Sequence, residues 1–318
     1  MMERDLSHIR RVDIELQSFC NRKCDWCPNK KFDRTFRDEM PEDIYLNLLH
    51  QLNDGGFGRY GLQCQPIRNS DEQIPVDTQI LSFIGYQECF SDIEFTKKRL
   101  IQAREILDDR ICFVTSTNGD LITKESLENL LFTNIGIQDY DNKGLNYWLT
   151  KFEELDILPI GYTESLGMLY GIHRYIESIT VKLDWSKNQL LQNRGGFFKK
   201  SDLPNHKWTN DMRKRIAPCP EPEYYINIYY DGSVMPCCHM RPDNPKHEEF
   251  ILGNIKETSL IDIYYSEKAE RFREQMRIEN GEYPEPCQYC QKVRPENCLG
   301  SPSGWNYFAN KYQSEVNI

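Results

Sequence analysis

Three cysteines near the start of the chain, Cys20, Cys24 and Cys27, constrain its structure more than any other feature. They lie in the stretch SFCNRKCDWCPN, which is too short for a disulfide framework and provides one ligand too few for a closed metal site. A cubane iron–sulfur cluster has four irons, which cysteine thiolates usually hold, so three thiolates leave one iron open. An open metal position is typical of a catalytic centre. The alternative is a zinc knuckle with a distant fourth ligand, although zinc ligands usually come in paired sets.

Composition limits the class of protein. The chain has 318 residues, of which 39% are hydrophobic and 12% aromatic, enough for one large domain and one small one. No apolar run approaches the roughly 20 residues of a membrane helix, and no signal sequence is recognisable. Twelve cysteines are too few for a disulfide scaffold of this length, so we expect a cytoplasmic protein. The net charge of −10 argues against a nucleic-acid surface, which requires clustered Lys and Arg.

The first two-thirds of the chain alternates short apolar runs with helical patterns, an order typical of parallel βα units. The spacing of apolar residues predicts helices over 41–52, 91–107 and 145–155 and strands over 80–84 and 111–115. Ser91 and Glu94 are predicted to form a capping box at the start of the second helix. The Gly- and Pro-rich segment 54–77 interrupts this order and is either a flexible insertion or a substrate lid.

A second set of cysteines follows a change in composition at Cys219. Two β-prone runs, 224–230 and 233–238, flank Asp231-Gly232, a dipeptide that predicts a hairpin with a two-residue turn. A helix is expected to follow 258–259, where Thr or Ser can serve as its N-cap. The thiols that such a fold can bring together are those of Cys219, Cys237, Cys287 and Cys290. On spacing alone, this four-thiolate set fits zinc and an iron–sulfur cluster equally well.

The N-terminal triplet, with its Cys-x3-Cys-x2-Cys spacing after the apolar run 12–16, resembles the signature of radical S-adenosylmethionine (SAM) enzymes. The resemblance implies that the open iron binds SAM and that an electron delivered there releases a 5'-deoxyadenosyl radical. It also implies an α/β fold in which the βα units close into a partial (β/α)6 barrel, similar to part of a TIM barrel. We expect this radical SAM barrel over residues 1–210.

The spacing of Cys219, Cys237 and the CQYC pair at 287–290 resembles the twitch form of the SPASM extension. The resemblance implies a small C-terminal domain over 211–318, built from a β-hairpin and a helix, that holds an auxiliary 4Fe-4S cluster. Two 4Fe-4S clusters and SAM are therefore the expected cofactors. Cys298 does not fit the spacing and is expected to be a spare thiol.

The family resemblance also implies roles for residues outside the cysteine sets. Glu88 lies where radical SAM enzymes carry the Glu of a Gly-Gly-Glu-Pro motif, and it would hold the SAM amino group. Ser116 and Asn118 would contact SAM, although a simple Asn-Gly turn explains the same residues. Arg194, in the segment NRGG, would face the substrate and SAM, as in enzymes of the 2-deoxy-scyllo-inosamine dehydrogenase type, which it resembles.

The implied reaction is oxidation of an alcohol to a ketone on a polar small molecule, such as a sugar or an aminocyclitol, with the auxiliary cluster as electron acceptor. Reduced flavodoxin or a ferredoxin-type protein would supply the initial electron. The alternative is radical epimerisation or peptide modification, with Cys238 or Cys64 as hydrogen donor. His239 is a further catalytic candidate because it can accept a proton. A zinc-scaffolded interaction protein is the non-enzymatic alternative.

Overall fold

The computed structural model describes residues 4–32, 34, 36–58, 79–107, 109–183, 195–206 and 214–290. Its N-terminal part alternates strands with helices, as the sequence predicts. In chain order the elements are β1 (Arg11–Ile14), α1 (Glu42–Asp54), β2 (Ile80–Phe83), α2 (Ile93–Ile106), β3 (Cys112–Thr117), α3 (Lys124–Leu127), β4 (Asn134–Gln138) and α4 (Leu145–Glu154). The four strands pair in parallel, so their carboxyl ends meet at one edge of the sheet. Most of the predicted insertion, from residue 59 onward, lies outside the described residues.

After α4 the chain leaves the βα order and forms an antiparallel meander. Its strands are β5 (Leu158–Thr163), β6 (Met168–His173) and β7 (Ile176–Lys182), and β7 then pairs in parallel with β4. The connections are too short for a crossover helix, which needs about a dozen residues, so only hairpins can form. Gly167, at φ 59°, closes the first of these hairpins. The sequence did not predict this departure.

The C-terminal part continues the same sheet. Its elements are α6 (Glu221–Tyr224), β8 (Tyr225–Ile228), β9 (Ser233–Met235), β10 (Gly253–Asn254), α7 (Leu260–Tyr264) and α8 (Glu267–Arg277). Because β8 pairs in parallel with β1, the strand order is β10-β9-β8-β1-β2-β3-β4-β7-β6-β5. The sheet therefore crosses the predicted boundary at 210/211, and the division into two domains stays a prediction. Short 3-10 turns occur at Pro28–Lys30, Cys89–Asp92, Glu164–Leu166, Lys200–Asp202, Pro245–Phe250 and Glu285–Cys287.

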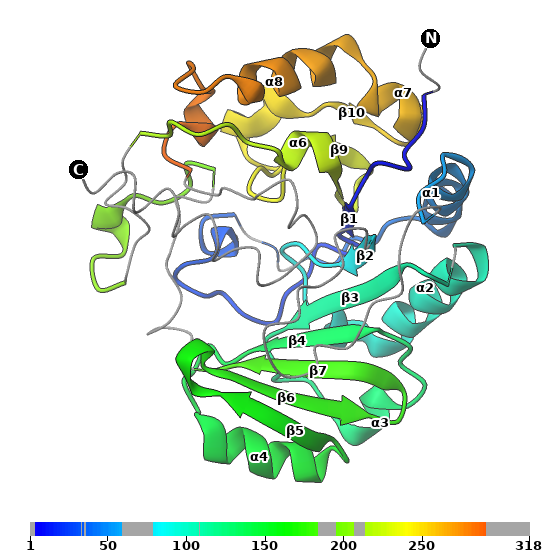
Figure 1. Cartoon of the computed structure of the whole chain (residues 1–318), viewed down its shortest axis with the longest axis vertical. Helices are drawn as coiled ribbons and strands as arrows, with labels where there is room; N and C mark the ends of the chain where they lie inside the picture. Colours follow the sequence, from blue (N-terminus) through cyan, green and yellow to red (C-terminus); the bar gives the residue numbers. More distant parts are fainter. Residues whose placement is uncertain are drawn as a thin grey trace.

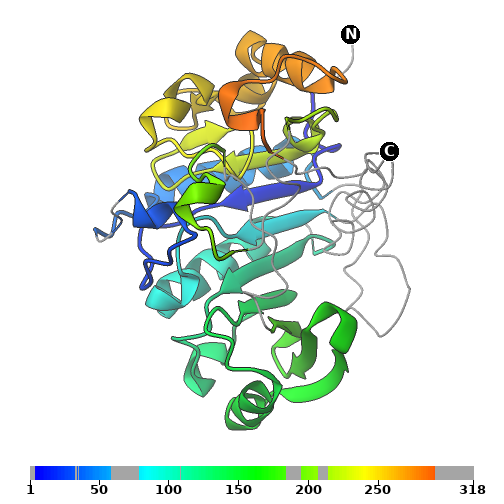
Figure 2. The same cartoon turned by 90° about the vertical axis from the view of Figure 1, so that its left-hand side faces the viewer.

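Figure 1 shows the sheet running from the C-terminal helices α7 and α8 at one end to α4 and β5 at the other. The view turned by 90° in Figure 2 keeps this order, with the C-terminal helices in yellow to orange above and the α4 to β7 region in green below. Strand β1 lies between the two, beside β8 and β2. The expected α/β class, with a C-terminal hairpin and helix, is confirmed. Among the described helices, none is long and apolar enough to cross a membrane.

The two faces of the sheet differ in polarity. One face is apolar and packs against α1 to α4 and α7 in the main hydrophobic core. Alternation along the strands, together with their register, places polar side chains on the other face. These polar residues are Asp13, Ser82, Ser116, Gln138 and Lys182. This polar face corresponds to the inside of the expected partial barrel, and Gln138 and Lys182 pair at its carboxyl edge.

Three local predictions need correction. The side chain of Asp92, not Ser91, caps α2 by accepting from the Phe95 N–H at 3.1 Å, because Glu88 first caps a separate 3-10 turn. The hairpin turn is longer than two residues, since the Gly232 N–H donates to the Tyr229 carbonyl and Tyr229 pairs with Ser233. Gly232 adopts φ 86°, as in a turn followed by a bulge. The apolar spacing that predicts a helix over 145–155 includes Leu149 in one apolar stripe, but in α4 (Leu145–Glu154) Leu149 is 37% exposed, whereas Trp148 and Phe152 are buried.

Candidate active site

The first cysteine set lies on the loop that follows β1. The Cys27 N–H donates to the Cys24 carbonyl at 3.0 Å, and a 3-10 turn at Pro28–Lys30 ends the loop. Burial raises the pKa of Cys20 to about 12, and nearby Glu88 and the other two thiols add to this shift. Burial and the neighbouring thiol of Cys27 raise the pKa of Cys24 to about 11. The three thiols therefore lie close enough to act on one another, which fits a shared cluster that binds them as thiolates.

Glu88 lies under this loop and is 2% exposed. Its carboxylate accepts hydrogen bonds from the Thr117 hydroxyl at 2.7 Å and from the backbone N–H groups of Asn118 and Phe90 at 3.0 and 3.2 Å. Burial raises the pKa of Glu88 despite these donors. A carboxylate has about four acceptor positions, so three internal donors leave about one for an ammonium group. Contact between Glu88 and SAM stays a prediction, and the structure adds a clear role in fixing the loop.

The two other predicted SAM contacts lie in different settings. Asn118 is 6% exposed, and its side-chain amide donates to Asn21 beside Cys20 at 2.8 Å, so the structure brings Asn118 to the first cysteine loop. Ser116 is exposed on the polar face of β3 and pairs with Gly136 of β4. A Cβ at Gly136 would lie 3.3 Å from the Ser116 hydroxyl, so the glycine leaves room beside it.

Sequence reasoning missed two supports of the first loop. The Gln87 side chain accepts from the backbone N–H groups of Leu16 and Gln17 at 3.0 and 3.1 Å and donates to the Ile14 carbonyl at 3.2 Å. It thereby fastens the loop after β2 to the end of β1. Arg22 forms ion pairs with both Asp120 and Asp141, at 2.5 and 2.6 Å. No local motif signals either support, because their partners lie about 70 to 120 positions away.

Three thiols of the second cysteine set, those of Cys219, Cys287 and Cys290, act electrostatically on the buried Arg215. The pKa of Cys219 is raised by burial and lowered by the Arg215 guanidinium, and that of Cys287 is raised by burial and by the thiols of Cys290 and Cys219. These three thiols therefore act electrostatically on one another, and their chemistry fits an iron–sulfur cluster. Cys237 packs against the same apolar cluster as Cys219. Within the described ranges, no three or more His, Cys, Asp or Glu side chains form a group that could hold a metal ion, so all seven ligand assignments stay predictions.

One apolar cluster lies between the two sets, and we call it the bridging cluster. Its members are Tyr86, Tyr229, Met235, Met240, Phe272, Met276, Tyr283 and Cys287. Cys27 from the first set packs against it, as do Cys219 and Cys237 from the second. Tyr86 comes from the loop after β2, and its hydroxyl donates to the Cys238 carbonyl at 3.2 Å. The two cysteine sets are thus joined through packed side chains.

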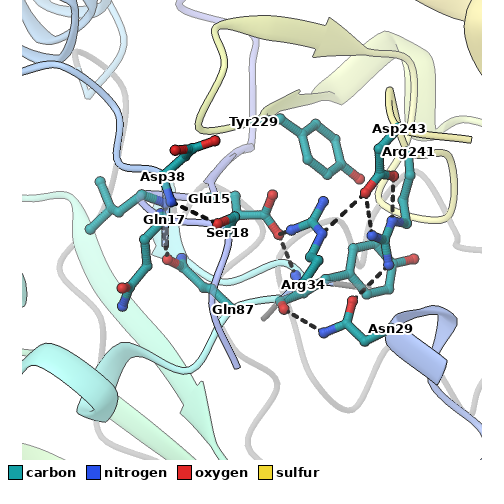
Figure 3. Close-up of polar contacts among 12 residues, drawn as sticks. Glu15, Gln17, Ser18, Asn29, Arg34, Asp38, Gln87, Tyr229, Arg241 and Asp243 are labelled. Carbon is teal, nitrogen blue, oxygen red and sulfur yellow. Dashed lines mark hydrogen bonds and ion pairs between the residues drawn. The ribbon is translucent and has the colours of Figure 1, made fainter. Parts of the chain in front are cut away.

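A buried polar network runs beside the bridging cluster (Figure 3). Arg34 is 3% exposed and pairs with Glu15 at 2.7 Å and with Asp243 at 3.2 Å. Arg241 is fully buried, pairs with the same Asp243 and donates to Asn29 at 2.7 Å. Glu15 also accepts from the Tyr86 N–H at 2.6 Å. This network ties the first cysteine loop, the sheet and the C-terminal part together.

The remaining predicted residues lie close to this junction or outside the described ranges. His239 is 5% exposed, and its carbonyl lies 2.5 Å from where a Cβ on Gly195 would be. Gly195, at φ 66°, therefore has no space for a side chain. Cys238 is half-buried next to His239. Predicted residues outside the described ranges are Arg194, Cys64 and Cys298.

Comparisons with known proteins agree with this geometry. The SPASM family, described as an iron–sulfur cluster-binding domain, matches residues 219–291. The chain is 25% identical over 288 residues to S-adenosyl-L-methionine-dependent 2-deoxy-scyllo-inosamine dehydrogenase from Niallia circulans, covering 89% of this chain and 92% of that protein.

Solved structures share the fold. The crystal structure of BtrN in complex with AdoMet and 2-DOIA matches with a TM-score of 0.60 and 18% identity, over 91% of this chain and 95% of that one. Selenomethionine BtrN in an open conformation matches with a TM-score of 0.54 and 18% identity, over 91% and 94%. The chain thus contains a match to the SPASM iron–sulfur cluster-binding domain over residues 219–291 and is similar along most of its length to S-adenosyl-L-methionine-dependent 2-deoxy-scyllo-inosamine dehydrogenase, and it shares the fold of BtrN.

Proposed function

We propose that this protein is a SAM-dependent oxidoreductase that oxidises a secondary alcohol of a polar small molecule to a ketone. The observation that carries this proposal is the bridging cluster, against which Cys27, Cys219 and Cys237 all pack. An electron that leaves a substrate at the first site would then have a route to the second through packed side chains. The relative from Niallia circulans is named as a dehydrogenase of 2-deoxy-scyllo-inosamine, and we propose an amino-polyol of this class as the substrate.

The residues of the chain take defined parts in this reaction. Cys20, Cys24 and Cys27 would hold the first 4Fe-4S cluster, and the second set would hold the other. When bound, the clusters and SAM supply a hydrogen-abstracting 5'-deoxyadenosyl radical and an electron acceptor. Gln87 and Glu88 fasten the loop after β2 to the end of β1 and to the residue after β3 through four hydrogen bonds of their side chains to backbone groups.

The polar face of the sheet supplies groups suited to a hydroxyl-rich substrate. Ser116, Gln138 and Lys182 lie there near the carboxyl edge, where ligands bind in open parallel sheets. Burial lowers the pKa of Lys182, which makes its amine a better proton acceptor at neutral pH. Lys182 is therefore our candidate for the group that takes the hydroxyl proton during oxidation.

Anaerobic reconstitution tests the proposal. Metal analysis is expected to find about eight irons per chain, whereas two or three zincs would favour the scaffold protein. With SAM, dithionite and 2-deoxy-scyllo-inosamine, mass spectrometry is expected to detect 5'-deoxyadenosine and a ketone. Solvent deuterium on the substrate carbon would instead indicate epimerisation with Cys238 as donor. Fully reconstituted protein that forms no 5'-deoxyadenosine would refute the class of chemistry.

Two variants sharpen this test. Lys182→Met is expected to keep 5'-deoxyadenosine formation but to slow ketone formation by about 10²-fold, the usual range for loss of an acid–base group. For variants in which ligand cysteines are changed to Ala, the matched control is Cys89→Ala, since Cys89 is a buried thiol outside both sets. Reduced flavodoxin or ferredoxin is the proposed electron donor in place of dithionite. A reducing, cytoplasmic compartment is proposed because it keeps the ligand thiols unpaired.

A further inference from the structure

Arg215 is a buried cation beside the segments that carry Cys219, Cys287 and Cys290. It is 3% exposed, and its guanidinium donates hydrogen bonds to three backbone carbonyls. Its Nε donates to Ala217 at 2.7 Å and its terminal nitrogens donate to Pro218 at 2.9 Å and to Cys290 at 2.8 Å. Its own backbone N–H donates to the Gln288 carbonyl at 2.5 Å. Arg215 thus holds together two of the three segments that carry the predicted ligand thiols, those of Cys219 and of the CQYC pair.

These contacts join parts of the chain that no secondary structure connects directly. Ala217 and Pro218 lead into Cys219, whereas Gln288 and Cys290 belong to the CQYC pair about 70 positions later. An arginine fork has a fixed geometry with five donors, so three carbonyls held by it are fixed relative to one another. Lysine carries the same charge on a flexible stem and cannot reproduce this grip.

The charge of Arg215 also lies close to the predicted ligands. Its terminal nitrogens donate to the carbonyl of Cys290 itself at 2.8 Å and to the carbonyl of Pro218, the residue before Cys219, at 2.9 Å. Reduction adds negative charge to a cluster, so a fixed positive charge beside it stabilises the reduced state.

We propose that Arg215 is a positioning residue of the auxiliary cluster, which locks its ligand segments together and raises its reduction potential. The inference rests on the proposed iron–sulfur ligand set. It adds that one side chain, Arg215, makes the auxiliary cluster a better electron acceptor. Arginine at this position would therefore favour transfer of the substrate electron to the auxiliary cluster.

The test uses the full chain with Cys20, Cys24 and Cys27 all changed to Ala, so that only the auxiliary cluster can assemble. In this background, the potential is measured by EPR-monitored redox titration for Arg215, Arg215→Gln and Arg215→Lys. Arg215→Gln is expected to weaken the reduced state at least tenfold, a downward shift of about 59 mV for one electron. Arg215→Lys is expected to retain most of the potential but to release iron to a chelator several times faster.

The control is Arg273→Gln, because Arg273 is a 4% exposed arginine of the same region whose guanidinium binds the Tyr264 carbonyl and Glu270 instead. It is expected to leave potential and iron release unchanged. If Arg215→Gln binds iron and keeps the original reduction potential, the proposal that Arg215 raises this potential is wrong. If that variant holds no iron, Arg215→Lys decides, and an unchanged release rate there would overturn the locking part. Zinc in the second set would refute the proposed function itself, and metal analysis detects this separately.

Discussion

The two cysteine sets have opposite electrostatic surroundings. Beside the first set lies the buried Glu88 carboxylate, which raises the pKa of Cys20, and the nearby Arg22 is already paired with two aspartates. Beside the second set lies the buried Arg215 guanidinium, which lowers the pKa of Cys219. Negative surroundings lower the reduction potential of a cluster and make its reduced state a stronger electron donor, whereas positive surroundings raise that potential and make its oxidised state a better electron acceptor. The difference suits a chain in which the first site gives an electron and the second accepts one.

The largest expected effect comes from removing one set at a time. With Cys20, Cys24 and Cys27 changed to Ala, we expect complete loss of 5'-deoxyadenosine, because SAM has no iron to bind. With Cys287 and Cys290 changed to Ala, we expect SAM cleavage to continue while ketone formation falls to background. Both products are measured by mass spectrometry in anaerobic assays. Equal loss of both products in the two variants would break the proposed division of roles.

The network that joins the two regions gives the next largest effect. Arg34→Met is expected to destabilise the protein by about 3–5 kcal/mol, because it leaves Glu15 as an uncompensated buried charge. Arg37→Met is the matched control, since the Arg37–Asp92 pair is about one-third exposed and is expected to cost at most about 1 kcal/mol. Urea denaturation of the apoprotein measures both. Similar urea midpoints for the two variants would mean that the buried Arg34–Glu15 pair does not stabilise the contact between the two cysteine regions.

A smaller effect distinguishes the supports of the two loops. Gln87→Met removes three hydrogen bonds to the end of β1 and leaves buried backbone groups unpaired, at a cost of about 1–3 kcal/mol. Iron is expected to leave the first site faster, while the second site keeps its EPR signal. Faster loss from the second site alone would contradict the support that Gln87 is assigned here.

The smallest effect is a pH dependence of the stability that Asp243 contributes in the buried polar network. Burial would raise the pKa of Asp243, but its contacts with Arg241 and Arg34 hold that pKa below its ordinary value of 3.8. Its contribution to stability is therefore present above about pH 4 and is lost as the pH falls further. Asp243→Asn is expected to lower stability at pH 7 and to flatten the loss of stability between about pH 4 and pH 2. Urea midpoints at several pH values measure this, and equal slopes in both proteins would exclude it.

Much of the fold could be predicted because its signals are local. The apolar spacing of 41–52, the run at 80–84 and the Asp231-Gly232 turn all mark elements that the structure contains. The closeness of Cys20, Cys24 and Cys27 also followed from their spacing. The predicted cap of α2 by Ser91 was wrong because the next residue, Asp92, can serve the same role. Its side chain accepts the hydrogen bond from the Phe95 N–H.

Long-range contacts could not be predicted. The pairing of β8 with β1, the grip of Arg215 on Cys290 and the Arg34–Glu15–Asp243 network depend on residues that are distant in sequence. A single buried arginine has no periodic signal, and most arginines in any sequence are exposed. The sequence therefore supports a prediction of what the cysteines bind, but it does not predict the charged and buried groups that surround them.

The parallel pairing of β8 with β1 has a consequence for how the chain is made. During synthesis, β1 emerges early, yet its partner β8 follows about 200 residues later. Until then, one side of β1 is an open edge that could pair with another molecule. A shortened chain that ends before β8 is therefore expected to aggregate rather than to fold as an independent barrel. The iron-binding end of the protein completes the sheet on which the rest of the molecule is assembled.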